Sequence, residues 1–361
     1  MSSVFYPLKV KDLRKETEDC VSVAFDVPLE LRHVFAFQGG QHLIFRAFSE
    51  NGEELRRNYS ICVSPLDGEL RVAVKRIPSG YFSAYVHDRL QVGDELEVSP
   101  PQGKFFTQII NNQRKHYVAV AAGSGITPIM SLIKSVLTTE KQSRFTLIYA
   151  NKNKQSIIFR ETLEALKNQY MDRLSIYHVL SREHTGIDFL TGRIDREKMD
   201  YFLSKLIDPK GIDEVFLCGP EALIFLCKAA FENAGVDEKK IHFELFYSAR
   251  AETKKTARIL QAESSGGPES RVTLKLDGSS MVFNLPLHGA SILDAALSHG
   301  ADLPYSCKGG VCATCKCLLE EGEVSMDVNY ALEADELKRG FILACQSHPV
   351  SEQVTVNYDV K

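Results

Sequence analysis

The sequence predicts a multidomain chain with a β domain first, a parallel α/β domain second and a β-rich α+β domain last. Three observations predict this order: alternating strands over residues 4–107, strand and helix patterns that alternate from residue 117, and a return of alternating strands after residue 270. The chain has 361 residues. Since one domain usually spans roughly 100–200 residues, two or three hydrophobic cores are expected.

Residues 1–110 are predicted to form an antiparallel barrel or sandwich. Alternating runs such as Val21–Phe25 and Leu70–Val74 are separated by Gly, Pro and Asp turns, which is typical of both architectures. These runs alone leave the choice between the two open.

Residues 111–247 are predicted to form the α/β domain. The apolar run Tyr117–Ala122 leads into two glycines and then into helical periodicity, and a further helix is predicted over Ile157–Tyr170. The other strands are predicted at Phe145–Tyr149, Leu174–Leu180 and Glu214–Cys218. Because strands and helices alternate, the sheet is expected to be parallel.

Residues 248–270 are predicted to be a linker, and residues 271–361 the last domain. The linker has little apolar content, and its Gly/Ser-rich part, Ser264–Pro268, is expected to be flexible. In the last domain Asp277-Gly278 stands between two alternating runs, which predicts a hairpin.

The charge balance argues against nucleic acid as a partner, and the lack of long apolar runs argues against a membrane. Lys and Arg number 43 against 47 Asp and Glu, for a net charge of −4, whereas nucleic-acid binders need a basic surplus. The sequence has neither an apolar run of about 18 residues nor a basic and then apolar leader. We therefore expect a cytoplasmic protein that binds neither nucleic acid nor membrane.

A cysteine motif in the last domain predicts a 2Fe-2S cluster. Cys307, Cys312 and Cys315 have the spacing C-x4-C-x2-C, and Cys345 follows at a distance, which is the plant-type ligand pattern. Thiolates are soft ligands that suit iron–sulfur clusters, and the N–H groups of Gly309 and Gly310 are expected to face the cluster sulfurs.

The alternative is a zinc knuckle. Structural zinc favours two close cysteine pairs, and the motif has only one. Cys317 lies two residues beyond Cys315 and is expected to be a packed thiol rather than a ligand.

Two segments of the first domain are candidates for holding a phosphate-bearing flavin. In Arg57-Asn58-Tyr59-Ser60 the guanidinium suits a phosphate, the phenol ring is flat and amphipathic, and the hydroxyl can bond a ring nitrogen. Farther on, Ser83 is predicted to cap a helix after Gly80, and a helix N-terminus can bind pyrophosphate. The alternatives are a solvated strand edge and an ordinary capped surface helix.

The α/β domain carries two turn motifs that suit a dinucleotide. Gly123-Ser124-Gly125-Ile126-Thr127-Pro128 follows a strand and opens a helix, although Pro128 replaces the third glycine of the usual fingerprint. Cys218-Gly219-Pro220 ends a later strand, where a plain turn with a buried thiol is the alternative.

Arginines after the Leu174–Leu180 strand indicate NADPH. Ser181 and Arg182 follow this strand, Arg193 comes soon after, and a guanidinium suits the 2′-phosphate. No acidic residue stands directly after the strand to bind an NADH ribose. Solvated loop arginines are the alternative.

These motifs together, in this order, resemble the ferredoxin-NADP reductase superfamily, and the last ninety or so residues resemble plant-type ferredoxins, which implies a flavin-binding β-barrel and a C-terminal β-grasp domain. The resemblance implies Ser60, Cys218 and Glu244 as catalytic residues. It implies FAD contacts from Arg57, Tyr59, Ser60, Ala73, Val74, Lys75, Gly80, Ser83 and Thr127, and nucleotide contacts from Gly123, Gly125, Gly219, Pro220 and Phe246. The nucleotide contacts of Ser181, Arg182 and Arg193 are predicted from the residues alone.

The domain order resembles the reductase components of multicomponent oxygenases, most closely the phenylacetyl-CoA epoxidase reductase type, with ketosteroid hydroxylase reductases as near relatives. This resemblance implies electron transfer from NADPH through FAD and a 2Fe-2S cluster to a partner iron oxygenase. Phthalate dioxygenase reductases share the order but use FMN, and the pyrophosphate-site residues favour FAD here. The alternatives are a stand-alone reductase of small acceptors and a noncatalytic zinc-binding module.

Overall fold

The structure is a computed structural model that describes residues 4–48, 51–52, 54–78, 80–246 and 268–360. Residues 5–246 form one compact unit and the described residues 268–360, with Val4, belong to a second. The predicted linker 248–270 lies outside the described residues except for its last three positions, so its expected flexibility and the predicted domain bounds stay predictions.

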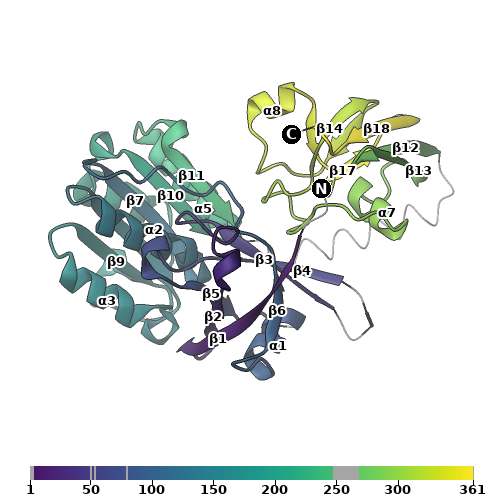
Figure 1. The fold of residues 1–361 in the computed structure, drawn as a ribbon. Helices are drawn as coiled ribbons and strands as arrows, with labels where there is room; N and C mark the ends of the chain where they lie inside the picture. The colour runs from purple at the N-terminus through teal and green to yellow at the C-terminus, as the bar shows by residue number, and fades with distance from the viewer. Residues whose placement is uncertain (1–3, 49–50, 53, 79, 247–267, 361) are drawn as a thin grey trace. The chain divides into compact units, whose positions relative to one another are not determined.

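The first domain is an antiparallel β-barrel. Its sheet order is β4-β3-β6-β1-β2-β5, and an antiparallel bridge between Ile61 and Val72 joins the two edge strands (Figure 1). Leu43, Phe45 and Val98 fill the interior, each at most 1% exposed, and helix α1 adds Phe82 and Val86 to the same core. The elements are β1 (Tyr6–Thr17), β2 (Cys20–Asp26), β3 (His42–Phe48), β4 (Glu54–Ser60), β5 (Leu70–Lys75), α1 (Tyr81–Asp88) and β6 (Glu95–Val98).

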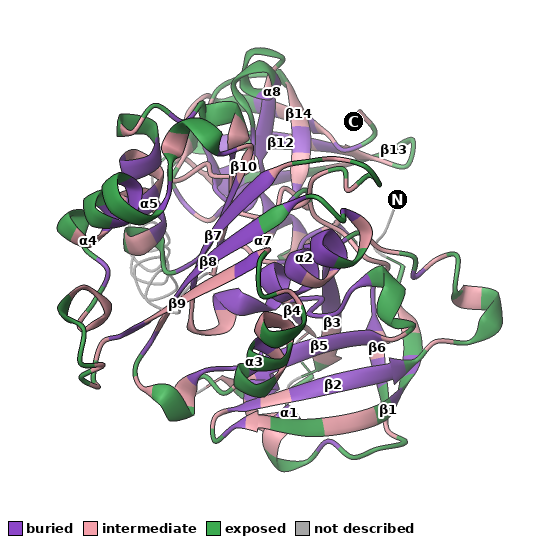
Figure 2. Ribbon diagram, turned by 90° about the vertical axis from the view of Figure 1, so that its left-hand side faces the viewer, coloured by how far each residue is buried: buried purple, intermediate pink, exposed green. Residues whose placement is uncertain are grey.

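The second domain is the predicted parallel sheet with helices. The strand order is β11-β10-β7-β8-β9 and every pairing is parallel. Figure 2 shows β7, β8 and β10 largely buried and β9 mostly half-buried, with exposed surface on α3 and α4. The elements are β7 (His116–Ala122), α2 (Ile126–Thr139), β8 (Arg144–Asn151), α3 (Arg160–Gln169), β9 (Leu174–Leu180), α4 (Arg196–Tyr201), β10 (Glu214–Gly219), α5 (Glu221–Asn233) and β11 (Ile241–Leu245).

The helix predicted over Ile157–Tyr170 is shorter than expected. Phe159 has a φ of 60° in the left-handed region, so the α-helix begins only at Arg160. Ile157 and Ile158 are buried ahead of it. Their apolar side chains therefore anchor a turn rather than the first turn of the helix.

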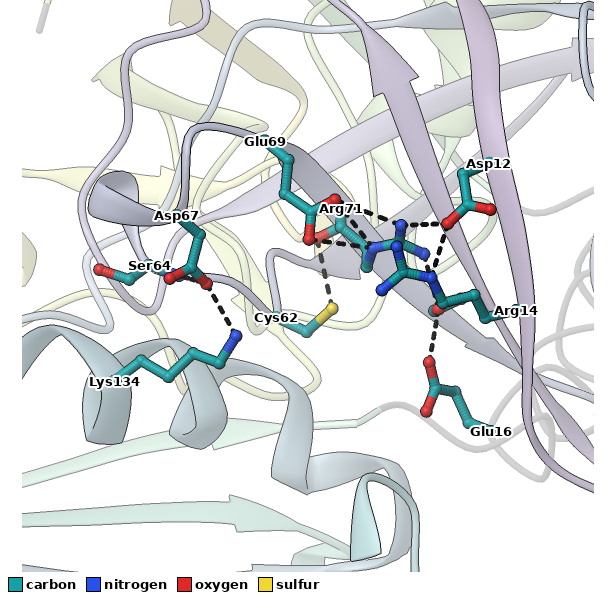
Figure 3. A network of polar contacts seen from close by, with 10 residues as sticks. Asp12, Arg14, Glu16, Cys62, Ser64, Asp67, Glu69, Arg71 and Lys134 are labelled. Atoms are coloured by element: carbon teal, nitrogen blue, oxygen red, sulfur yellow. Dashed lines mark hydrogen bonds and ion pairs between the residues drawn. The ribbon is translucent and has the colours of Figure 1, made fainter. Parts of the chain in front are cut away.

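Helix α2 joins the barrel to the α/β domain. Ser131 Oγ donates to the backbone carbonyl of Val63, and Ser135 Oγ donates to Ser64 Oγ across 3.1 Å. The ammonium of Lys134 lies 2.7 Å from a carboxylate oxygen of Asp67 (Figure 3). These contacts fix the first two domains against each other, and any site between them is preorganised.

The same view shows how the barrel wall is held. Arg71 is 3% exposed and its guanidinium lies between the carboxylates of Asp12 and Glu69 (Figure 3). The hydrogen bond from Arg71 lowers the pKa of Asp12. A buried charge with two partners and a further bond to Ser22 is satisfied, which removes most of the cost of its burial.

The C-terminal unit has the β-grasp arrangement that the resemblance implied. Its main sheet has the order β13-β12-β18-β14-β16, with β12 and β18 parallel. The predicted hairpin is confirmed: Leu276 pairs with Ser279, and Asp277 and Gly278 have φ of 50° and 72°, as a two-residue turn of this kind requires. The elements are β12 (Glu269–Leu276), β13 (Ser279–Pro286), α7 (Ile292–Ser298), β14 (Lys316–Glu321), β15 (Val324–Met326), α8 (Ala334–Lys338), β16 (Phe341–Leu343), β17 (Ser347–Pro349) and β18 (Gln353–Asn357).

Candidate functional sites

Ser60 and Glu244 meet at the junction of the barrel and the α/β domain. Ser60 ends β4 and is 5% exposed, and its Oγ donates to Glu244 Oε2 across 3.3 Å. Glu244 lies on β11, directly across from Cys218 of β10 in the parallel register. Two of the three candidate catalytic residues are thus in contact, and the third is on the neighbouring strand.

A histidine that the sequence did not single out extends this contact. His42 Nδ1 lies 3.6 Å from Glu244 Oε1, and the side-chain amide nitrogen of Asn58 lies 3.5 Å from His42 Nε2. His42 is 4% exposed and its Nδ1 has no hydrogen-bond partner within bonding distance. His42 sits in an apolar strand and Asn58 at the variable position of the R-x-Y-S motif, so only the tertiary structure reveals them.

The two glycine motifs of the α/β domain pack on each other. A Cβ on Gly125 would lie 2.1 Å from the backbone oxygen of Cys218, and one on Gly219 would lie 3.1 Å from Cβ of Ala122. Gly123 has a φ of 55°, and a Cβ there would meet only Lys75 Nζ of the barrel, at 3.8 Å. Gly125 and Gly219 therefore let the ends of β7 and β10 pack closely together. At Gly123 the backbone is covered by no side chain of its own, and its nearest neighbour is Lys75 Nζ.

Three further predicted residues lie in or next to the two glycine motifs. Thr127 is 3% exposed and its Oγ1 donates to the carbonyl of Ser124, so it closes its own turn. Cys218 is fully buried, and this burial raises its pKa well above that of an ordinary thiol. Phe246 N–H donates to the carbonyl of Gly219 across 3.3 Å, which holds the end of the E-x-F segment beside the second motif; Pro220 is exposed next to it.

Among the predicted flavin residues of the barrel, Tyr59 stacks on a neighbouring aromatic ring and Arg57 is exposed. Tyr59 stacks on Phe82 with ring centroids 5.6 Å apart and an interplanar angle of 30°, and burial raises the pKa of its hydroxyl. Arg57 is exposed and donates Nη1–H to the carbonyl of Arg56. On β5, Ala73 and Val74 are buried, and the ammonium of Lys75 lies 3.4 Å from Asp19.

The prediction that Ser83 caps α1 is wrong. Gly80 is the N-cap, because its extended backbone (φ −82°, ψ 107°) makes Tyr81 the first helical residue. Ser83 Oγ instead turns back, donating to the carbonyl of Gly80 and accepting from the N–H of Ile77. A Cβ on Gly80 would lie 2.7 Å from this hydroxyl, so the two residues shape the loop whose following N–H groups can face an anion.

The residues predicted for the 2′-phosphate gather at the end of β9. Leu180 bridges to Thr191, and the N–H of Gly192 donates to the carbonyl of Leu180, so the chain leading to Arg193 runs beside the one leading to Arg182. Both arginines are exposed and Ser181 is half-buried. A pocket of about 350 Å³ reaches Leu180 of the same strand but is lined by none of these three residues; its lining is Lys154, Ile157, Arg160, Glu164, Ile176, Tyr177, His178, Leu180, Thr185, Ile187 and Leu190.

The four predicted cluster ligands affect each other's protonation in two pairs. The thiol of Cys312 lowers the pKa of Cys307 to about 6, and Cys307 raises the pKa of Cys312. The thiol of Cys315 lowers the pKa of Cys345, and Cys345 raises the pKa of Cys315. Each pair thus holds one sulfur that favours the thiolate form, the form that binds metal.

The backbone around the pairs is built for sulfur. Gly309 N–H donates to Cys307 Sγ across 3.3 Å, and the backbone of Gly310 helps to lower the pKa of Cys345. Lys308, Gly310 and Ala313 all have left-handed φ values, between 48° and 76°, so the loop turns tightly between the cysteines. The N–H of Gly309 therefore faces a sulfur, as expected.

The donor set suits a two-iron cluster, because four cysteine sulfurs are the ligands of plant-type clusters and loop N–H groups suit the charge on their sulfurs. Within the described part of the chain no three His, Cys, Asp or Glu side chains are placed to hold a metal ion, so the ligand set stays a prediction. Cys317 is fully buried, and this burial raises its pKa, as expected of a packed thiol.

None of the helices in the described residues is long and apolar enough to cross a membrane. The family model for oxidoreductase FAD-binding domains matches residues 7–107, that for oxidoreductase NAD-binding domains matches 119–229, and that for 2Fe-2S iron-sulfur cluster binding domains matches 274–350. The three matches follow the order of the three folded parts.

Similar proteins extend over the whole chain. The chain is 44% identical over 359 residues to one of the subunits of 1,2-phenylacetyl-CoA epoxidase from Escherichia coli (strain K12), covering 99% of both chains. It is 35% identical to the ferredoxin reductase component of 3-ketosteroid-9-alpha-monooxygenase from Mycobacterium tuberculosis, covering 98% of this chain and 95% of that one. Phthalate dioxygenase reductase has the same fold, with a TM-score of 0.61, 24% identity and 98% of both chains covered.

Proposed function

Because the chain belongs to the family of oxygenase reductase components that combine FAD-binding, NAD-binding and 2Fe-2S domains, we propose that it carries electrons from NADPH to a separate iron oxygenase. The chain is an oxidoreductase with FAD, a pyridine nucleotide and a 2Fe-2S cluster as its redox groups. FAD takes up two electrons as a hydride and releases them singly, and the cluster carries one electron at a time. The protein positions these groups.

The observation that carries the proposal is the Ser60–Glu244 contact between the barrel and the α/β domain. It lies where a residue assigned to the flavin and the strand end assigned to the nicotinamide come together, near the buried thiol of Cys218. In this role Glu244 accepts the hydrogen of the Ser60 hydroxyl and so fixes its direction, which leaves the oxygen of Ser60 free to accept a hydrogen bond from the flavin ring. The glycine backbone at Gly123 and Gly125 leaves room for the nucleotide.

Arg182, Arg193 and Ser181 are the residues we assign to the 2′-phosphate. Their exposed guanidinium groups and the half-buried hydroxyl are at one strand end, and a pocket of mixed lining begins at Leu180 of the same strand. A planar guanidinium binds phosphate oxygens in a bidentate way. The aliphatic part of the pocket, Ile176, Leu180 and Ile187, suits the adenosine end of the same nucleotide.

We assign Cys307, Cys312, Cys315 and Cys345 as the cluster ligands, supported by their plant-type spacing and by the N–H of Gly309 that donates to Cys307 Sγ. All nine cysteines of the chain are free of disulfides, in keeping with a reducing compartment. We therefore place the protein in the cytoplasm, where NADPH is also available.

The partner we propose is an iron oxygenase of the phenylacetyl-CoA epoxidase type, on the strength of the 44% identity to a subunit of such an enzyme. The test combines the purified chain, NADPH and the purified oxygenase subunits with phenylacetyl-CoA. Product formation that requires both the chain and the oxygenase supports the proposal. NADPH oxidation at full rate without the oxygenase, with no gain in product when it is added, would instead indicate a stand-alone reductase.

A further inference from the structure

The side-chain amide of Gln346 contacts a predicted cluster ligand. Gln346 directly follows Cys345 and is 5% exposed. The two N–H groups of its Nε2 face three acceptors, Cys345 Sγ at 3.4 Å, the backbone oxygen of Lys308 at 2.8 Å and the carbonyl of Cys345 at 3.0 Å, so one hydrogen is shared between two of them. One NH₂ group therefore bonds the fourth ligand and also reaches the loop that carries the first.

The surrounding structure fixes the position of this amide. The backbone N–H of Gln346 donates to the carbonyl of Leu343, and its own carbonyl accepts from the N–H of Asp327. Gly310 packs against the stem of the side chain, since a Cβ on that glycine would lie 3.2 Å from Gln346 Cγ. A buried side chain held at both ends keeps its N–H directed at the sulfur.

We infer that Gln346 is a positioning residue that sets the reduction potential of the cluster through its N–H bond to Cys345 Sγ. This inference rests on the proposed assignment of the four cysteines as ligands. Reduction adds negative charge to the cluster and its sulfurs, so an N–H dipole aimed at a ligand sulfur stabilises the reduced form more than the oxidised form. Burial keeps water from taking over the same bond.

Gln346 differs from the other donors because it is a side chain. The N–H groups of Gly309 and Gly310 belong to the backbone and are present with any residue at those positions that the loop can accept. The amide of Gln346 can be removed by a single substitution that keeps the loop. Its contribution to the cluster potential can therefore be measured separately from that of the backbone donors. A substitution at this position changes the potential without changing the ligands.

The first test is Gln346→Met in the full-length protein with its cofactors. Methionine has a similar length and no N–H, so the visible and electron paramagnetic resonance spectra of the cluster should persist. The equilibrium for reduction should become about tenfold less favourable, a potential about 59 mV more negative. An intact cluster with an unchanged potential would overturn the inference.

Ser347→Ala is the matched control. Ser347 is fully buried and its Oγ donates to the carbonyl of Leu343, so the variant loses a buried hydrogen bond at the next residue but no donor to sulfur. Its cluster potential should equal that of the parent protein. A shift as large as that of Gln346→Met would show a general effect of loosening this turn and would overturn the inference.

A measurement on the unaltered sequence covers the case in which Gln346→Met does not assemble its cluster. With ¹⁵N in the side-chain amides of glutamine, pulsed electron paramagnetic resonance of the reduced cluster should show a coupled ¹⁵N nucleus. The other glutamine among residues 268–360, Gln353, is exposed on β18. If the reduced cluster shows no coupled ¹⁵N nucleus, the inference about Gln346 is overturned while the proposed cluster site stands. If the parent protein has no iron–sulfur spectrum, both the proposed cluster site and the inference are overturned.

Discussion

Ser60 Oγ donates a hydrogen bond to Glu244 Oε2 across 3.3 Å and across 184 positions of sequence. Ser60 ends a strand of the barrel, and Glu244 lies near the end of the last strand of the parallel sheet. The bond therefore exists only when the two domains are docked as they are here, through contacts such as Lys134 with Asp67. A hydroxyl held in this way has a fixed direction at the junction.

The first prediction concerns this hydroxyl. Ser60→Ala should slow reduction of the bound flavin by NADPH about 10²-fold, because a reacting pair that loses an orienting contact falls out of its productive geometry. FAD content should stay close to that of the parent protein, since Arg57, Tyr59 and the loop at Gly80 are unchanged. Anaerobic stopped-flow absorbance measures the rate, and the flavin spectrum measures the content.

Thr107→Val is the control for that variant. Thr107 Oγ1 donates to Glu214 Oε1, also across 3.3 Å, and joins the segment after the barrel to the start of β10. It is a hydroxyl–carboxylate bond of the same kind, made at the start of β10 rather than near the end of β11. Flavin reduction should be unaffected in Thr107→Val; equal slowing of both variants would mean that Ser60 acts only through domain docking.

Sequence patterns predicted the parts of this site but not their assembly. Ser60 and Glu244 were each identified within a short motif, and the parallel order of β7 to β11 follows from alternating strands and helices. The contact between them depends on how two domains dock, which no local pattern encodes. His42 was missed for the same reason, because a histidine within an apolar strand gives no local signal of a distant carboxylate.

The error at Ser83 has a local cause. Serine is preferred over glycine as an N-cap, but the extended backbone of Gly80 places the helix start three residues earlier. Ser83 then serves the same turn from inside the helix, bonding back to Gly80 and Ile77. At the cluster the cysteine spacing predicted the ligands, whereas Gln346 was missed because one polar residue after a cysteine forms no pattern.

The second prediction separates the cysteine ligands from the fifth cysteine of the domain. Cys345→Ser should abolish or alter the iron–sulfur spectrum, because a serine hydroxyl replaces a thiolate at one iron. Cys317→Ser should leave that spectrum intact, since Cys317 lies fully buried in the core beside Tyr358. Iron and sulfide content together with the visible spectrum measure both; loss of the cluster in well-folded Cys317→Ser would contradict the assignment.

The third prediction is a pH dependence of stability from His116. This histidine is 6% exposed at the start of β7, and burial, with Arg144 nearby, lowers its pKa to about 4. Its pKa in the unfolded chain is about 6.5. Between these values the unfolded state binds more protons, so the stabilisation is fully present above about pH 6.5 and is lost as the pH falls toward 4.

The measurement compares the free energy of unfolding in urea at pH 7 and pH 5. From pH 7 to pH 5 the parent protein should lose about 2 kcal/mol more than His116→Gln, which has no group that titrates there. Gln can still bond Thr146, the present partner of His116 Nε2. The same loss in both proteins would show that other groups cause the pH dependence.

The last prediction concerns the choice of nucleotide. Arg182→Gln removes one of the guanidinium groups assigned to the 2′-phosphate, and a charge-assisted bond to phosphate contributes roughly 1.5–3 kcal/mol. The KM for NADPH should therefore rise at least about tenfold, while the KM for NADH, which has no 2′-phosphate, should stay the same. Arg196→Gln is the control, since Arg196 is an exposed arginine of α4 paired with Asp200 and should change neither value. Equal increases of the KM values for NADPH and NADH in Arg182→Gln would show that Arg182 stabilises the strand end rather than binding the 2′-phosphate.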